Sequence, residues 1–202
     1  MKKVNLHRLE DYFLSQNQPI FTISDVVFGF AMNKRSASVF LFNNVKKGAI
    51  TRLKAGLFSL PHHMPHEFVI ANRLYMPSYI SLDTALSFHG LIPETVYRIT
   101  SITSKATKEF EVGHLIYSYN KIKREAFYGY ELYNLEKGRV YIAKPEKAIA
   151  DFLYFVYLGK RVYNDRLAWR NVDFKKVEDY LKLFLKKKLI LFARKKFKEY
   201  VR

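Results

Sequence analysis

Cysteine is absent from this 202-residue sequence, which excludes disulfide bonds, zinc–thiolate sites and catalysis by a thiol. Only eight glycines occur, and none is spaced as in a phosphate-binding loop or a dinucleotide-binding fingerprint. No apolar run approaches the roughly 18 residues of a membrane-spanning helix. Charged residues from His7 to Asp11 interrupt the N-terminal segment, so it lacks the apolar core of a signal peptide. We therefore expect a cytoplasmic protein with no membrane partner, no metal and no cofactor.

Acidic residues are scarce, because 18 Asp and Glu stand against 35 Lys and Arg, a net charge of +17. Residues 1–61 hold 9 basic and 3 acidic residues (+6), residues 62–165 hold 13 and 11 (+2), and residues 166–202 hold 13 and 4 (+9). A surplus of this size predicts attraction to nucleic acid, an anionic membrane surface or an acidic protein. Basic modules at both ends of a nearly neutral centre favour a binding protein over an enzyme.

Large apolar side chains are plentiful, with 49% hydrophobic residues, 17 Phe and 15 Tyr, as in a folded protein. The length allows one large domain or two small ones. We predict an α+β protein whose domains are residues 1–61 and residues 62–202.

The segment 1–61 has the pattern of a winged helix-turn-helix. Asn5 is placed to cap a first helix, and Thr22 or Ser24 a second one. A third helix is expected over residues 35–46, followed by a basic hairpin over residues 49–60.

The third helix suits the major groove of DNA, which admits a helix whose side chains reach base edges. We expect Val39, Phe40 and Phe42 to point inward. The residues expected to contact bases are polar or basic: Arg35, Ser36, Ser38 and Asn43. The residues expected to hold the DNA backbone are all basic: Lys34, Lys46, Lys47, Arg52 and Lys54.

The segment from residue 62 to residue 158 mixes helices and strands. Helices are expected at residues 67–74, at residues 82–89 with Ser81 as N-cap, and from Pro145 onward. Period-two patterns predict strands at residues 97–103, 109–112, 115–119, 127–133 and 139–143, with a tight turn at residues 136–138.

Three segments resemble the abortive-infection AbiEi antitoxin family. They are KGAITRLKAGLF at residues 47–58, YISLDTALSFHGL at residues 79–91 and VYIAKPEKA at residues 140–148. The order and spacing of these segments agree with the family over about residues 5–158, whereas the basic tail has no counterpart that we can match. The resemblance implies an N-terminal winged helix joined to an antitoxin domain. It further implies a phage-defence repressor that binds its own operator in double-stranded DNA and counteracts a toxin of nucleotidyltransferase fold.

Chemically active clusters are weakly indicated. His62, His63 and His66 invite a metal hypothesis, but Pro65 opposes a helix that would align them, and an interdomain linker explains them as well. Ser81, Asp83 and His89 resemble a nucleophile–acid–base trio, although Ser81 is better explained as a helix cap. On the helix from Pro145 we expect an i, i+4 ion pair of Lys147 with Asp151, in a charged cluster with Lys144 and Glu146 that is either structural or a contact surface for a partner.

The C-terminal segment is predicted to form two basic helices. Their expected apolar stripes are Phe174, Val177, Tyr180, Leu181 and Phe184, and Leu189, Leu191, Phe192, Phe197 and Tyr200. A second basic surface is expected at Lys186, Lys187, Lys188, Arg194, Lys195 and Lys196. This surface contacts phosphates, docks an acidic protein or is simply solvated.

The sequence thus favours a DNA-binding autorepressor and antitoxin that is not an enzyme. Two alternatives stay open, a protein–protein adaptor and a nucleic-acid-processing enzyme of the α+β segment.

Overall fold

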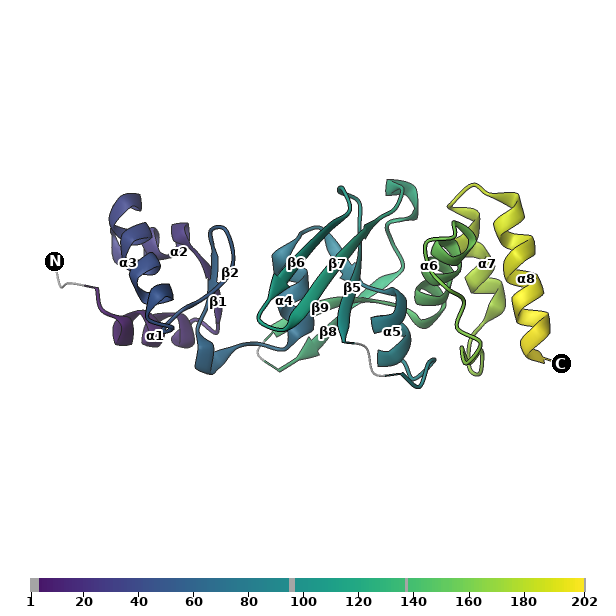
Figure 1. The fold of residues 1–202 in the computed structure, drawn as a ribbon, viewed down its shortest axis with the longest axis horizontal. Helices are drawn as coiled ribbons and strands as arrows, with labels where there is room; N and C mark the ends of the chain where they lie inside the picture. Colours follow the sequence, from purple (N-terminus) through teal and green to yellow (C-terminus); the bar gives the residue numbers. More distant parts are fainter. Residues whose placement is uncertain (1–3, 95–96, 137, 202) are drawn as a thin grey trace. The chain divides into compact units, whose positions relative to one another are not determined.

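The computed structural model describes residues 4–94, 97–136 and 138–201 (Figure 1). The fold is α+β, as predicted. The chain divides into two compact units: unit 1 holds residues 1–74 and 135–138, and unit 2 holds residues 75–134 and 139–202. Residues 62–74 therefore belong to unit 1, beyond the predicted boundary after residue 61. Among the described helices, none is long and apolar enough to cross a membrane.

Unit 1 begins with helices and a short strand, continues with a hairpin and then has further helical segments (Figure 1). Its elements are α1 (Leu6–Ser15), β1 (Ile20–Thr22), α2 (Ile23–Phe30), α3 (Lys34–Lys46), β2 (Thr51–Lys54), β3 (Leu57–Ser59), the 3-10 helix η1 (Pro61–His63) and α4 (Glu67–Leu74). The three strands form an antiparallel sheet in the order β1-β3-β2. This is the predicted order of helix, strand, helix, helix and hairpin.

Side-chain caps set the starts of the first three helices. The Asn5 side chain accepts a hydrogen bond from the backbone N–H of Arg8 at 2.9 Å, and Asn33 caps α3 in the same way. Thr22, rather than Ser24, caps α2. Its backbone N–H donates to Asp25 Oδ2 at 2.6 Å while the Asp25 N–H donates to Thr22 Oγ1 at 3.2 Å, a capping box.

Aromatic side chains dominate the core of unit 1. Phe13 of α1 and Phe21 of β1 are fully buried and stack with their ring centroids 4.2 Å apart. Leu9 and Val26, also fully buried, pack in the same cluster, and α3 adds Leu41 to it. This cluster joins all three helices to the sheet and fixes which face of α3 turns outward.

The strands described after β3 form one six-stranded sheet of order β6-β7-β5-β4-β9-β8. The sheet belongs to unit 2 except for Leu135 and Gly138, which are assigned to unit 1. The strands are β4 (Ser78–Ile80), β5 (Arg98–Thr103), β6 (Lys108–Val112), β7 (Leu115–Lys121), β8 (Tyr130–Leu135) and β9 (Gly138–Ala143). The β5–β7 and β4–β9 pairs are parallel, whereas β4–β5 and β6–β7 are antiparallel. Strand β8 begins at Tyr130, not at residue 127 as predicted, because the 3-10 helix η2 (Arg124–Ala126) precedes it. The predicted turn at residues 136–138 includes Lys137, which lies outside the described residues.

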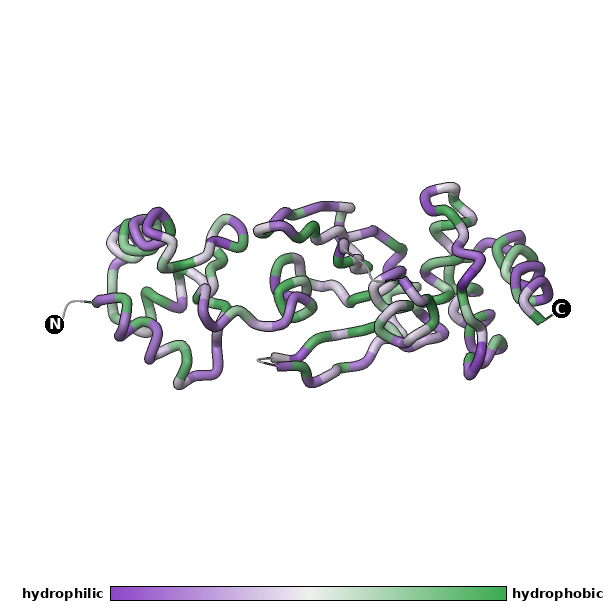
Figure 2. Tube along the Cα trace, turned by 60° about the horizontal axis from the view of Figure 1, so that its bottom comes forward, coloured by the Kyte–Doolittle hydropathy of each residue, from purple (hydrophilic) through white to green (hydrophobic). Residues whose placement is uncertain are grey.

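Four helices accompany this sheet: α5 (Leu82–Phe88), α6 (Pro145–Tyr157), α7 (Phe174–Lys182) and α8 (Lys187–Val201). Helix α6 packs against α5, α7 and α8 (Figure 1). Hydrophilic and hydrophobic positions both occur along the C-terminal helix (Figure 2). Its buried residues include Leu189 and Ala193, but Leu191 and Tyr200 are 62% and 47% exposed. Their predicted place in the apolar stripe was wrong, because the buried stripe of α8 runs through Leu189 and the small Ala193.

Candidate nucleic-acid interface

Helix α3 buries a different set of side chains from the one that the sequence predicted. Ala37 and Leu41 are buried, and Phe40 packs partly against the core. Val39 and Phe42 are 53% and 56% exposed, so their predicted inward orientation was wrong. The small Ala37 lies in the buried seam, one helical turn from Leu41. Residues 39 and 42 then fall on the opposite face, since side chains repeat every 3.6 residues.

The residues predicted to contact bases lie at different depths. Arg35, Ser36 and Asn43 are exposed, with Arg35 on the same stripe as Val39. Ser38 is half-buried, and its hydroxyl donates to the Lys34 carbonyl at 2.8 Å. The outer face of α3 therefore combines a guanidinium, an amide and a hydroxyl with two apolar side chains.

The basic residues at the two ends of α3 point into solvent. Lys34, Lys46 and Lys47 are exposed and have no ion pair within the described part of the chain. The ammonium of Lys46 lies 4.6 Å from the centroid of the Phe42 ring, a cation–π contact. This contact holds the charge beside the exposed apolar pair, and no carboxylate among the described residues neutralises it.

The β2–β3 hairpin turns at Gly56, whose φ of +75° is the left-handed conformation that glycine adopts easily. Arg52 of β2 is exposed, while its neighbour Leu53 is buried. Lys54 lies differently: its Nζ donates to the Leu74 carbonyl at 2.6 Å, at the C-terminal end of α4. A cation is favourable at that end of a helix dipole, so Lys54 has a structural partner that the sequence did not reveal.

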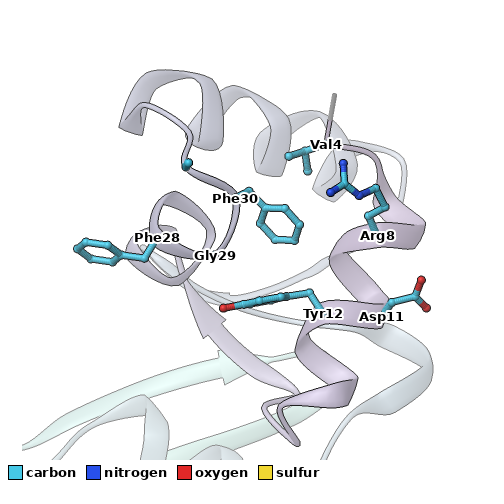
Figure 3. Close-up of a pocket in the computed structure, with 8 residues that line it drawn as sticks. Val4, Arg8, Asp11, Tyr12, Phe28, Gly29 and Phe30 are labelled. Carbon is cyan, nitrogen blue, oxygen red and sulfur yellow. The ribbon is translucent and has the colours of Figure 1, made fainter. Parts of the chain in front are cut away.

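A hollow of about 460 Å³ lies beside α1 and the end of α2 (Figure 3). Tyr12 and Phe30 line it together with Phe28, which is 85% exposed. Arg8 and Asp11 at its rim carry opposite charges. The hollow therefore lacks the single sign of charge that would favour a polyanion, unlike the outer face of α3 and the hairpin.

The predicted second basic surface of the C-terminal helices splits into two groups. Arg194 forms a bidentate ion pair with Glu178, with Nε–Oε1 at 2.5 Å and Nη2–Oε2 at 3.2 Å. Lys196 pairs with Glu199 at 2.9 Å. The other members are exposed and have no ion pair among the residues that the structure describes: Lys186, Lys187, Lys188 and Lys195.

A buried polar network occupies the interior of unit 2. The predicted i, i+4 pair of Lys147 and Asp151 is present, with Nζ–Oδ1 at 2.5 Å, but both side chains are fully buried. The hydroxyls of Ser81 and Tyr79 donate to Asp151 Oδ2 at 2.8 and 3.0 Å. Lys147 also lies 5.0 Å from the Phe184 ring centroid. This pair is an internal brace and cannot be a contact surface for a partner.

Burial governs the titration of this network. It raises the pKa of the Asp151 carboxyl, while Lys147, Ser81 and Tyr79 act in the opposite direction. Burial and the neighbouring Asp151 raise the pKa of Tyr79 well above its usual value. The Tyr79 hydroxyl is thereby kept protonated and able to donate.

The nucleophile–acid–base trio does not assemble. Ser81 occupies the N-cap position of α5, yet its hydroxyl donates to Asp151 rather than capping the helix. Asp83 pairs with Arg161, and His89 Nε2 lies 2.7 Å from the Ala143 carbonyl oxygen. Each member of the trio thus has a separate structural partner.

The histidine-rich segment has no metal geometry. His66 Nδ1 accepts a hydrogen bond from the backbone N–H of Phe68 at 3.2 Å. Over the ranges that the structure describes, no group of three or more His, Asp or Glu side chains is placed to hold a metal ion.

Val39 and Phe42 are the exposed residues on the outer face of α3 that the sequence analysis did not place there. Arg35 and Lys46, both predicted to face outward, are spaced at i and i+11, and positions 39 and 42 fall between them on the same stripe. That periodicity is the signal that could have found them.

No protein-family model matches the chain, and no curated protein matches it significantly.

Proposed function

We propose that this protein is a DNA-binding transcriptional autorepressor and antitoxin whose first unit is a winged helix-turn-helix. The observation that carries the DNA-binding half is the set of exposed cations on α3 and β2 that have no carboxylate partner among the described residues. The set consists of Lys34, Arg35, Lys46, Lys47 and Arg52. Cations without internal partners are available to phosphates, and DNA binding releases the counterions of those phosphates.

In this proposal the exposed stripe of α3 enters the major groove. Arg35 donates to guanine O6 and N7, the most common specific contact in the groove, and Asn43 pairs with an adenine edge. Val39 and Phe42 supply the apolar surface that a thymine methyl group favours. Ser36, at the start of the helix, reaches a base edge or a phosphate.

The remaining cations fix the position of the helix on the duplex. Lys34 and Lys47 are placed at its two ends, and Lys46 lies beside Phe42, so all three suit phosphates along the groove. Arg52 brings the hairpin against the DNA backbone. Lys54 was included in this set from the sequence, but its bond to the Leu74 carbonyl gives it a structural role in our proposal.

The antitoxin half rests on the resemblance to AbiEi antitoxins. On the basis of this resemblance, we propose that unit 2 acts on a partner toxin of nucleotidyltransferase fold. The exposed lysines of the second basic surface, Lys186 to Lys188 and Lys195, either extend the DNA footprint or meet that toxin.

Two double variants that remove equal charge test the DNA interface. Lys46→Ala with Lys47→Ala removes two cations from α3, and Lys186→Ala with Lys187→Ala removes two from the C-terminal surface. We expect the first pair to weaken binding of the protein's own upstream duplex about tenfold or more in fluorescence anisotropy, with a smaller effect of the second. If the first pair binds the duplex as tightly as wild type, or loses less affinity than the second pair, the assignment to α3 is wrong.

A growth assay tests the antitoxin half separately. A neighbouring gene for a nucleotidyltransferase-fold protein should arrest growth when expressed alone, and co-expression of this protein should relieve the arrest. If growth stays arrested, the antitoxin role is wrong, while the DNA-binding role is unaffected.

A further inference from the structure

Unit 2 contains a polar pocket that the proposed DNA-binding function does not use. Its volume is about 350 Å³, within the range of small-molecule sites. Strands β5, β6 and β7 form its floor, and the loop after α6 supplies Lys160 and Arg161. All of its lining residues belong to unit 2.

Two donors in this pocket lack acceptors. Ser118 is only 6% exposed, and its Oγ has no hydrogen-bond partner within the described residues. Asn120 lies two positions further along β7, on the same face of the sheet, and its Nδ2 is likewise buried and unpartnered. A buried donor without a partner carries a desolvation penalty that an acceptor in the pocket would remove.

The charge of the pocket is positive once its internal pairs are subtracted. Arg98 pairs with Glu109, and Arg161 pairs with Asp83. Lys160 is exposed and has no ion pair in the part of the chain that the structure describes. Each guanidinium also has more N–H donors than one carboxylate contact consumes. The pocket thus offers donors from an amide, a hydroxyl, an ammonium and two guanidiniums, with one uncompensated positive charge.

We propose that this pocket binds a small phosphomonoester. An oxyanion has the acceptor oxygens that Ser118 and Asn120 need, and its charge is attracted by Lys160. The pocket is open enough for an organic group beside the phosphate, because its volume lies in the range of sites that hold whole ligands. Glu109 at the rim is neutralised by Arg98 and does not cancel this attraction.

Calorimetric titration of the full-length protein tests this site, with inorganic phosphate, a hexose phosphate and a nucleoside monophosphate as separate probes. We expect saturable 1:1 binding of the hexose phosphate or the nucleoside monophosphate, tighter than the binding of inorganic phosphate. Lys160→Ala and Ser118→Ala should each weaken that binding about tenfold, the value of one hydrogen bond to a charged group. Lys198→Ala removes an exposed lysine of α8 and should leave the affinity unchanged.

Thermal unfolding separates loss of the site from loss of the fold. Ser118→Ala removes a buried hydroxyl without a partner, so the melting temperature of the ligand-free variant should not fall. Binding that weakens in a variant of unchanged stability supports the site. The proposal is overturned if neither phosphomonoester binds wild type more tightly than inorganic phosphate does, or if Lys160→Ala and Ser118→Ala bind as tightly as Lys198→Ala. Neither outcome bears on DNA binding by unit 1.

Discussion

The two units of this protein differ in how part of their positive charge is used. In unit 1, cations such as Arg35 and Lys47 are exposed on α3 and have no ion pair among the described residues. In unit 2, Arg194 pairs with Glu178 and Lys147 is fully buried against Asp151. Other unit 2 cations, Lys186 to Lys188 and Lys195, are exposed and have no ion pair among the described residues. The net charge of +17 therefore overstates the charge that a partner can contact, because some of the cations are paired or buried within the protein.

The difference separates charges that stabilise the fold from charges that can bind. An exposed cation adds little to stability, because water already solvates it. A buried pair is costly to break, because the remaining partner keeps its charge in a low-dielectric interior. Variants of unit 1 should change affinity, and variants of the buried network should change stability.

The largest effect is expected from the buried network. Asp151→Ala leaves the ammonium of Lys147 buried without its partner, and it deprives Ser81 and Tyr79 of their acceptor. We expect the free energy of unfolding to fall by about 3–5 kcal/mol in urea denaturation. Asp179→Ala breaks an exposed pair with Lys182 and serves as the control, with little change. Similar, small losses for both would show that the buried pair is not a brace.

Next in size is the loss of a base contact. Arg35→Ala should weaken binding to the protein's own upstream duplex about 5- to 150-fold, the range of one good bidentate contact. The affinity for scrambled duplex should fall less, because that duplex offers no guanine at the matching position. Arg124→Ala, which removes an exposed arginine of unit 2, is the matched control for anisotropy measurements. An equal loss on both duplexes would make Arg35 a backbone contact instead.

A smaller, uniform effect is expected at the hairpin. Arg52→Ala should weaken binding to the upstream duplex and to the scrambled duplex by the same factor. The slope of log affinity against log salt concentration should become shallower by about 1. An unchanged slope would remove the hairpin from the interface. Arg52 is exposed, so the melting temperature should stay at the wild-type value.

The smallest effect is expected from the apolar pair on α3. Val39→Ser should weaken operator binding about fourfold, as loss of one buried methylene does. Replacing thymine by uracil at the contacted step removes the methyl group from the DNA and should have the same effect on wild type. If the uracil substitution weakens operator binding by the Val39→Ser variant as much as it weakens binding by wild type, the Val39 side chain does not contact the thymine methyl group.

Local signals were enough to predict much of unit 1. Asn5, Thr22 and Gly56 act through residues within one turn of their own position, so caps and turns are visible in the sequence. The predicted inward face of α3 was wrong at Val39 and Phe42, because the helix packs on the core through the small Ala37 and Leu41 rather than through its largest apolar side chains.

Non-local contacts limited the prediction of unit 2. The strands were largely predicted, but the parallel β5–β7 and β4–β9 pairs join segments that no turn connects directly. The spacing of Lys147 and Asp151 predicted their pairing, whereas their burial depends on Tyr79, 72 residues away from Asp151. The sequence likewise contains no sign that Ser118 and Lys160 line one pocket.

The most direct test of the central claim is a salt series with wild-type protein, its own upstream duplex and a scrambled duplex of the same length. We predict a specific excess of at least about 10³-fold that persists at physiological salt, with steep salt dependence for both duplexes. Equal affinities that collapse together as salt rises would contradict the account, because the exposed cations of α3 and the hairpin would then be a basic surface without an operator.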